Sequence, residues 1–245
     1  MPKSLIPSIQ PEPIELSFGQ KALQKGMEMY AKLLGKKEFV KNELQAHDGY
    51  IVRALCENYL SPLERKKIVG DRKLDEDFNF PLHNVYVHLD EKKILICYRG
   101  TDFTDVKDIL SDIQIILGTN AVDVRIKQSL EFYDQVTIKY PTHEKRIAGH
   151  SLGGTISYIV TKHRTPDRSI TFNAGSAPNK AFLSMMQDTF LKKERTKNIT
   201  TYKIFGDVVS AFSFIGNVQT LFLKSVDPVK LHTIASFPEF FEEKA

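Results

Sequence analysis

The 245-residue chain predicts an α/β fold, with a mostly parallel central sheet and helices on both faces. Three observations lead to this fold class. Hydrophobic residues make up 42% of the chain, enough to fill a sizeable core. After Val85, β-rich runs alternate with amphipathic helical patterns, which is typical of parallel strands joined by helices. One such strand-like run leads through a glycine-flanked serine directly into a helix.

The first segment differs in composition from the rest. Prolines at positions 2, 7, 11 and 13 keep it extended, so we expect residues 1–15 to form an arm and residues 16–245 a single domain. It has no apolar core of the kind a signal peptide needs, and no run in the chain approaches about 18 apolar residues. The net charge of +4 comes from scattered lysines, which gives little support to nucleic-acid binding.

The elements before the glycine-flanked serine are read from periodicity. Apolar spacing predicts two packing helices, the second ending at Ser61-Pro62, and then a charged connector and a hairpin. Further on, an amphipathic helix and a second helix lead to the serine-bearing strand. In chain order these elements are the helices Gln20–Leu34 and Glu43–Leu60, the connector Glu64–Phe80, the strands Val85–Leu89 and Ile94–Tyr98, and the helices Asp102–Leu117 and Val122–Lys139.

Beyond the serine the pattern weakens. Ser169–Asn173 and Thr200–Phe205 are expected strands, with a helix over Lys180–Leu191 between them. The remainder, Val208–Ala245, is rich in phenylalanine and only weakly patterned.

Ser151 is the candidate nucleophile. The segment GHSLG at 149–153 matches the Gly-x-Ser-x-Gly turn in which a serine projects from a strained junction between a strand and a helix. Glycines at both ends remove the Cβ atoms that would collide across so sharp a turn. The helix that follows directs its positive end at the same place, so it would stabilise a developing oxyanion there.

The base is identified by elimination. Acid and histidine follow the nucleophile in α/β-hydrolase folds, which leaves His163 and His232. His163 lies at the far end of the helix that begins at the serine, about 18 Å away at roughly 1.5 Å per residue. His150 adjoins the serine but faces elsewhere in such a turn, and we expect it to pack and hydrogen-bond beneath it. His232, in a segment of irregular pattern, is the predicted base.

Four aspartates compete for the role of the acid. Asp167 precedes a strand, at the opposite edge of the sheet from the serine, and Asp188 falls inside a helix. Asp207 directly follows a strand, at the carboxyl end where open α/β sheets place functional groups. Asp227 in an Asp-Pro turn is the alternative. We assign Asp207, whose role would be to orient His232 and stabilise its charged form.

An oxyanion hole requires two donors. One is the N–H of the residue after the nucleophile, Leu152, and the other comes from a loop after an earlier strand. The segment Arg-Gly-Thr at 99–101 closes the strand Ile94–Tyr98 and is the natural source. Thr101 could supply both its N–H and its hydroxyl.

Several of these motifs together resemble the class 3 lipase family over Tyr50–Phe237. The resemblance implies Ser151, Asp207 and His232 as a catalytic triad, Thr101 and Leu152 as the oxyanion hole, and a lid in the helix after Thr101. The motifs are Tyr-Arg-Gly-Thr at 98–101 with Asp108 and Asp112, Gly-His-Ser-Leu-Gly-Gly at 149–154, Thr-Phe-Asn at 171–173, Gly-Asp at 206–207, and the late His-Thr-Ile.

Two positions depart from the family pattern. Ile109 stands where the family often has an aromatic residue, and Val208 stands where proline is common. Neither removes a catalytic group. Without a signal peptide the chain resembles the compact intracellular or large-virus-encoded members, so we expect it in the cytoplasm, peripheral at lipid surfaces.

The predicted function is that of a serine carboxylester hydrolase acting on acyl lipids, with no metal or cofactor implied. The alternatives are a phospholipase A, a soluble esterase or thioesterase and, from a different class, a catalytically silent lipid-binding protein. Partners would be an ester or acyl-lipid substrate and, transiently, a lipid interface. The helix Asp102–Leu117 is either a mobile cover over Ser151 or a fixed core helix, since its periodicity fits both.

Overall fold

The computed structural model describes residues 43–101, 120–175, 196–207, 209–210, 213, 215–225 and 227–241. All of them belong to one compact unit, Lys41–Ala245. Four predicted features lie outside the described residues and stay predictions: the arm over residues 1–15, and the helices at 20–34, 102–117 and 180–191. The domain boundary at residue 16 is likewise untested.

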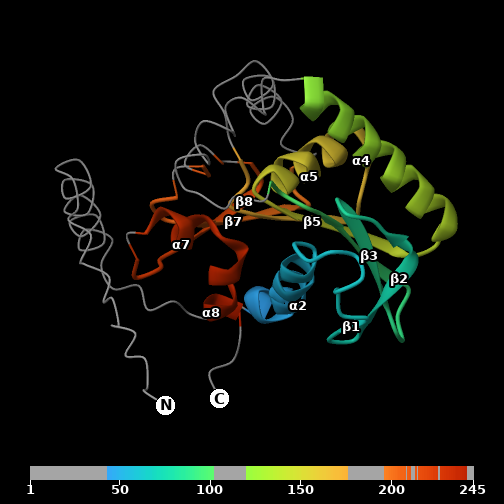
Figure 1. Ribbon diagram of the computed structural model, residues 1–245, viewed down its shortest axis with the longest axis horizontal. Helices are drawn as coiled ribbons and strands as arrows, with labels where there is room; N and C mark the ends of the chain where they lie inside the picture. The colour runs from blue at the N-terminus through green and yellow to red at the C-terminus, as the bar shows by residue number, and fades with distance from the viewer. Residues whose placement is uncertain are drawn as a thin grey trace, which may run out of the picture. The chain divides into compact units, whose positions relative to one another are not determined.

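A mixed sheet forms the centre of this unit (Figure 1). Its eight strands are neighbours in chain order. Strands β1 to β4 pair antiparallel, and β4 to β8 pair parallel. The strands are β1 (Ile68–Val69), β2 (Arg72–Asn79), β3 (His83–His88), β4 (Lys93–Tyr98), β5 (Glu144–His150), β6 (Arg168–Phe172), β7 (Ile199–Ile204) and β8 (Asn217–Leu221).

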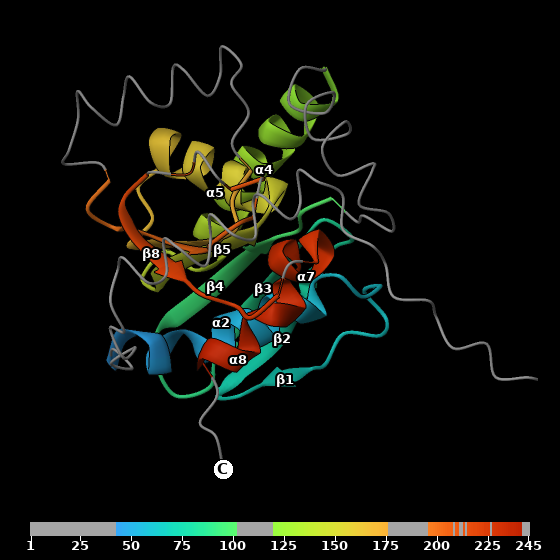
Figure 2. The same cartoon turned by 90° about the vertical axis from the view of Figure 1, so that its left-hand side faces the viewer.

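Helices cover both faces of the sheet, as Figures 1 and 2 show. One face carries α4 (Asn120–Lys139) and α5 (Leu152–His163). The other carries α2 (Glu43–Glu57), α7 (Pro228–His232) and α8 (Pro238–Phe241). The predicted α/β-hydrolase-type fold is therefore confirmed. The parallel part of the sheet consists of strands β4 to β8.

Alternation along β4 shows how one strand serves both cores. Leu95 and Cys97 pack into the core on the α2 side, whereas Ile94, Ile96 and Tyr98 pack into the core beneath α4 and α5. Successive side chains of a strand point to opposite faces. Because both faces are covered by helices, the strand reads as a continuous apolar run, which made it easy to predict.

The expected hairpin over 85–98 is confirmed as β3 and β4, with Val85 opposite Ile96. The charged connector expected at 64–80 is wrong, because it contains β1 and all of β2. In β2 only Arg72, Leu74 and Phe78 are buried, and the other positions are charged or polar and half-buried or exposed. A strand with so few apolar side chains gives a weak period-two signal.

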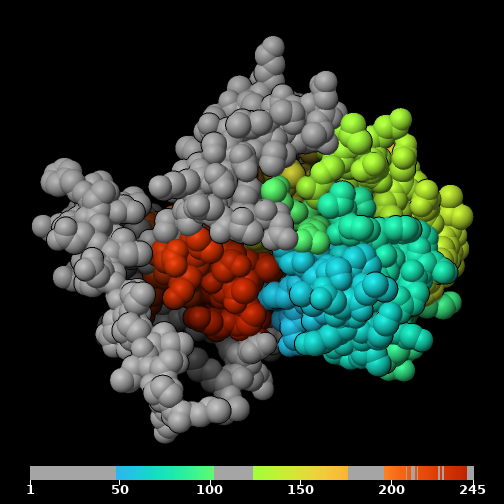
Figure 3. All heavy atoms as spheres, viewed as in Figure 1, coloured from blue at the N-terminus to red at the C-terminus, as the bar shows by residue number. Residues whose placement is uncertain are grey.

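The C-terminal part is more regular than its sequence predicts. After β8 the chain forms α7, a 3₁₀ turn at Ile234–Ser236 and α8. Figure 3 shows these C-terminal segments (red) beside α2 (blue), and α2 contacts both α8 and the 3₁₀ turn. Phe237 and Phe241 are buried there against the ring of Phe172 from β6. Phe237 and Phe241 are thus part of the core.

Candidate active site

Ser151 occupies a strained turn between β5 and α5. Its backbone has φ 57° and ψ −125°, a region that residues other than glycine rarely adopt. The two flanking glycines are required by close contacts. A Cβ on Gly149 would overlap the carbonyl of Gly153, and one on Gly153 would overlap the carbonyl of Tyr98. The turn therefore has the geometry expected of the Gly-x-Ser-x-Gly motif.

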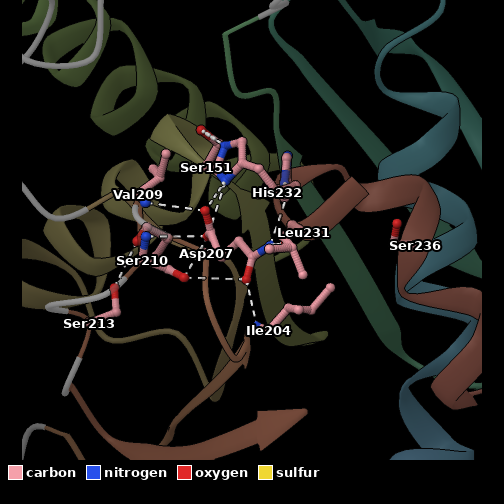
Figure 4. Close-up of polar contacts among 12 residues, drawn as sticks. Ser151, Ile204, Asp207, Val209, Ser210, Ser213, Leu231, His232 and Ser236 are labelled. Carbon is pink, nitrogen blue, oxygen red and sulfur yellow. Dashed lines mark hydrogen bonds and ion pairs between the residues drawn. The ribbon is translucent and has the colours of Figure 1, made fainter. Parts of the chain in front are cut away.

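Ser151, His232 and Asp207 are hydrogen-bonded in that order (Figure 4). His232 Nε2 lies 2.9 Å from Ser151 Oγ, and His232 Nδ1 lies 3.1 Å from each carboxylate oxygen of Asp207. Ser151 directly follows β5, Asp207 lies in the loop after β7, and His232 is the last residue of α7. All three residues are buried, with 0%, 4% and 4% of their surface exposed.

Neutral donors hold the carboxylate of Asp207. The N–H groups of Val209 and Ser210 donate to it at 3.1 Å and 3.2 Å, and the Ser210 hydroxyl donates at 2.6 Å. A carboxylate accepts and does not donate, so His232 carries its proton on Nδ1 and leaves Nε2 free to accept from the Ser151 hydroxyl. The arrangement can move a proton from Ser151 to His232.

The competing aspartates have other roles. Asp227 is exposed and caps α7, accepting from the N–H of Val229 at 2.9 Å. Asp167 accepts from the N–H of Lys145 at 2.7 Å, at the amino end of β6. The irregular segment expected around His232 is wrong, because this histidine ends a five-residue helix. Asp188 lies outside the described residues.

The loop after β4 runs beside the serine. A Cβ on Gly100 would overlap the His150 carbonyl and would lie 3.1 Å from Ser151 Cβ. Within the described part of the chain the Thr101 hydroxyl is buried and has no hydrogen-bond partner. The N–H of Leu152 is in the first turn of α5, where backbone amides have no acceptor within the helix. The role of Thr101 and Leu152 as an oxyanion hole stays a prediction.

His150 makes contacts that the sequence only suggested in outline. One ring nitrogen, Nδ1, lies 2.6 Å from the Tyr59 hydroxyl, and the other, Nε2, lies 2.6 Å from the carbonyl oxygen of His232. Burial and the neighbouring His232 lower the pKa of His150 to about 3, so its ring is neutral at ordinary pH. Asn173, at φ 42°, donates from Nδ2 to the carbonyls of Leu231 and His232 at 2.8 Å and 3.1 Å.

Sequence reasoning named Asn173 as part of a motif but gave it no role. Its signal was its position directly after β6, the edge at which Ser151 and Asp207 also lie. Among the described residues no group of three or more His, Cys, Asp or Glu side chains could hold a metal ion. Nor is any described helix both long and apolar enough to span a bilayer.

Comparison with known proteins relates the fold to lipases. Neither a family model nor a curated protein matches the chain. Among solved structures, the Lip2 lipase of Yarrowia lipolytica matches with a TM-score of 0.50 and 18% identity, covering 72% of this chain and 77% of its own. Lipase II of Rhizopus niveus matches with a TM-score of 0.45 and 16% identity, covering 75% and 82%. At such identity the likeness to Lip2 shows a shared fold, of the α/β-hydrolase type.

Proposed function

We propose that this protein is a serine carboxylester hydrolase that acts on acyl lipids and belongs to the class 3 lipase family. The observation that carries the proposal is the hydrogen-bonded order of Ser151, His232 and Asp207, at 2.9 Å and 3.1 Å, on a serine with positive φ. Backbone strain of this kind costs about 1–3 kcal/mol and persists only where the surrounding structure enforces it. It presents Ser151 Oγ to His232.

The reaction follows from these contacts. Ser151 Oγ attacks the ester carbonyl carbon while its proton passes to His232 Nε2. The carbonyl oxygen becomes negative and accepts hydrogen bonds from Thr101 and Leu152. His232 then gives the proton to the departing alcohol, leaving an acyl group on Ser151. Water attacks this acyl group, His232 takes the water's proton, and the fatty acid leaves as the proton returns to Ser151 Oγ.

The lipid preference has separate support. The fold is shared with Lip2, whose published description is that of a lipase, and the motifs from Tyr98 to His232 resemble those of class 3 lipases.

The helix expected at 102–117 lies outside the described residues, and we propose that it covers Ser151 in water. A cover predicts a jump in activity when the substrate passes from monomers to aggregates. Changing Phe103 and Val106 to serine should raise monomer activity and reduce the jump.

The decisive experiment is labelling with a fluorophosphonate probe, which reacts with activated serines. We expect the wild-type protein to be labelled and Ser151→Ala to remain unlabelled, with Ser157→Ala as the matched control. Ser157, in α5, is also buried, but its hydroxyl donates to the Gly153 carbonyl at 3.0 Å and, among the described residues, has no histidine partner. An unlabelled wild-type protein that still binds lipid would favour the silent lipid-binding alternative.

A substrate series then separates the enzyme classes. Hydrolysis of triacylglycerol emulsions supports a lipase, release of fatty acid from phospholipid vesicles supports a phospholipase A, and turnover confined to short soluble esters or thioesters supports an esterase or thioesterase. Each measurement is repeated with Ser151→Ala, so that a contaminating activity is recognised. A labelled protein that hydrolyses none of the acyl lipids would contradict the proposed substrate class and leave the nucleophile intact.

A further inference from the structure

The base of the proposed reaction sits at an unusual place, the last residue of a five-residue helix. The last carbonyls of a helix have no donor within it and need partners from elsewhere. For the last two carbonyls of α7, those of Leu231 and His232, the partners are two side chains at the carboxyl edge of the sheet. Asn173, after β6, donates to the carbonyls of Leu231 and His232, and His150, at the end of β5, lies 2.6 Å from the His232 carbonyl.

The contact with the carbonyl identifies the tautomer of His150. A carbonyl oxygen can only accept, so Nε2 of His150 carries the proton and donates it to His232. Nδ1 then has a free lone pair, which accepts a hydrogen bond from the Tyr59 hydroxyl at 2.6 Å. The Nδ1–H tautomer would bring two lone pairs together at the His232 carbonyl. The His232 carbonyl therefore selects the tautomer, and the Tyr59 hydroxyl, which can donate or accept, stabilises it by donating to Nδ1.

Tyr59 also contacts the loop that carries Thr101. A Cβ on Gly100 would overlap both the Tyr59 hydroxyl and the His150 carbonyl, so the three residues are in close contact. The guanidinium of Arg99 lies 5.4 Å from the centre of the Tyr59 ring. The turn after α2, which carries Tyr59, thus contacts the nucleophile turn, the loop of Thr101 and, through His150, the base.

We propose that His150 is a positioning residue, whose Nε2–H holds the His232 carbonyl so that the imidazole of His232 stays in line between Ser151 and Asp207, with the Tyr59 hydroxyl supporting His150 by donating to its Nδ1. This inference rests on the proposed function. The plain alternative is that His150 only fills space beneath the turn. The two differ because positioning requires one donor at one distance from the backbone, whereas filling space requires only volume.

Two substitutions of His150 separate these readings. In glutamine the amide nitrogen is as many bonds from Cβ as Nε2 is in histidine, so His150→Gln keeps a donor for the His232 carbonyl. In asparagine the amide is one bond shorter, so His150→Asn stays polar but cannot reach. We expect kcat for a soluble ester to fall about a hundredfold in His150→Asn with KM unchanged, and far less in His150→Gln. Tyr59→Phe should lower kcat about tenfold.

A readout that does not involve activity completes the test. In the wild-type protein, nitrogen-15 NMR of the imidazole should show His150 neutral, with the proton on Nε2. A proton on Nδ1 would overturn the proposal, even if the variants fail to fold. So would equal kcat in wild type and His150→Asn, or equal losses of kcat in the asparagine and glutamine variants accompanied by equal losses in Tm. A wild-type protein that is neither labelled nor active would overturn the proposed function instead.

Discussion

Asp207 and Asp48 are both buried carboxylates that accept several hydrogen bonds, yet their partners differ in charge. Asp48, on α2 and 0% exposed, accepts two N–H groups of Arg168 at 2.8 Å and 2.7 Å and the Tyr202 hydroxyl at 2.8 Å. Asp207 accepts from two backbone amides and from the Ser210 hydroxyl, and its fourth partner is His232. One carboxylate faces a permanent cation, the other a ring that gains and loses a proton.

The difference separates a structural role from a chemical one. Asp48 is paired with Arg168, and burial raises the pKa of this carboxyl despite that cation, so the pair is a structural contact between α2 and β6. The carboxylate of Asp207 accepts hydrogen bonds from neutral donors, and the Lys203 cation adds an electrostatic attraction. This carboxylate is therefore available to stabilise His232 when that ring takes the proton of Ser151.

The largest effect should come from Asp207→Asn. The amide would donate toward His232 Nδ1 and favour the wrong tautomer, so we expect kcat to fall by roughly 10⁴. Asparagine keeps an acceptor for the Ser210 hydroxyl, so the urea midpoint should change little. Steady-state kinetics and urea unfolding of the same preparation test both statements. Near-normal turnover in Asp207→Asn, together with loss of turnover in Asp227→Asn, would reassign the acid.

The opposite pattern is expected of Asp48→Ala. Removing this carboxylate leaves the Arg168 guanidinium without its ion partner, which should cost about 3 kcal/mol in the free energy of unfolding and leave kcat of the folded protein unchanged. The matched control is Asp134→Ala. Its bidentate pair with Arg164 also has 2.7 Å contacts but is about half-exposed, so its loss should cost roughly 0–1 kcal/mol. A loss of turnover in folded Asp48→Ala would contradict the assignment of a structural role to Asp48 and a chemical role to Asp207.

Two glycine substitutions sharpen the same contrast. Gly149→Ala would force the new methyl against the Gly153 carbonyl beneath the nucleophile. We expect a cost of about 1–3 kcal/mol from overpacking, along with a fall in kcat as the turn shifts. Thermal denaturation and kcat, measured side by side, test this. A variant as stable and active as wild type would show that the turn tolerates a side chain there.

Gly49→Ala, next to Asp48, should have the smallest effect. Its new methyl would lie 3.4 Å from the Phe241 carbonyl oxygen and 3.5 Å from Phe241 Cβ, which are ordinary contacts. Alanine is the better helix former, so α2 should gain up to about 1 kcal/mol, seen as a higher Tm with unchanged kcat. A clear loss of stability would mean that α8 packs on α2 more tightly than these distances indicate.

The parts of the fold that sequence predicted are those that rest on local patterns. The hairpin of β3 and β4, the helix α4 and the turn at Ser151 each have a periodicity or a motif within one short segment. Strand β2 was missed because most of its side chains are charged or polar, and β8 because only Leu221 of its five residues is buried. An edge strand with so little burial carries no periodic signal.

What the sequence could not predict at the candidate site has the same physical origin. Asp227 followed by Pro228 is a recognisable helix start, and the helix it caps was nevertheless expected to be irregular, because five residues are too few to show a period. The contact of His150 with His232 spans 82 residues, and that of Asn173 with Leu231 spans 58. No local pattern reports such contacts. Elimination named His232 as the candidate base, but only the coordinates show which groups contact its backbone.

The order of the strands has a consequence for how the molecule assembles. Since each strand pairs with its successor in the chain, the sheet can grow from β1 to β8 by adding one neighbour at a time. The turn at Ser151 lies midway along this order, but His232 and the segments that pack on α2 follow β8 in the chain. The proposed active site is therefore complete only when the late part of the chain has closed onto its early part.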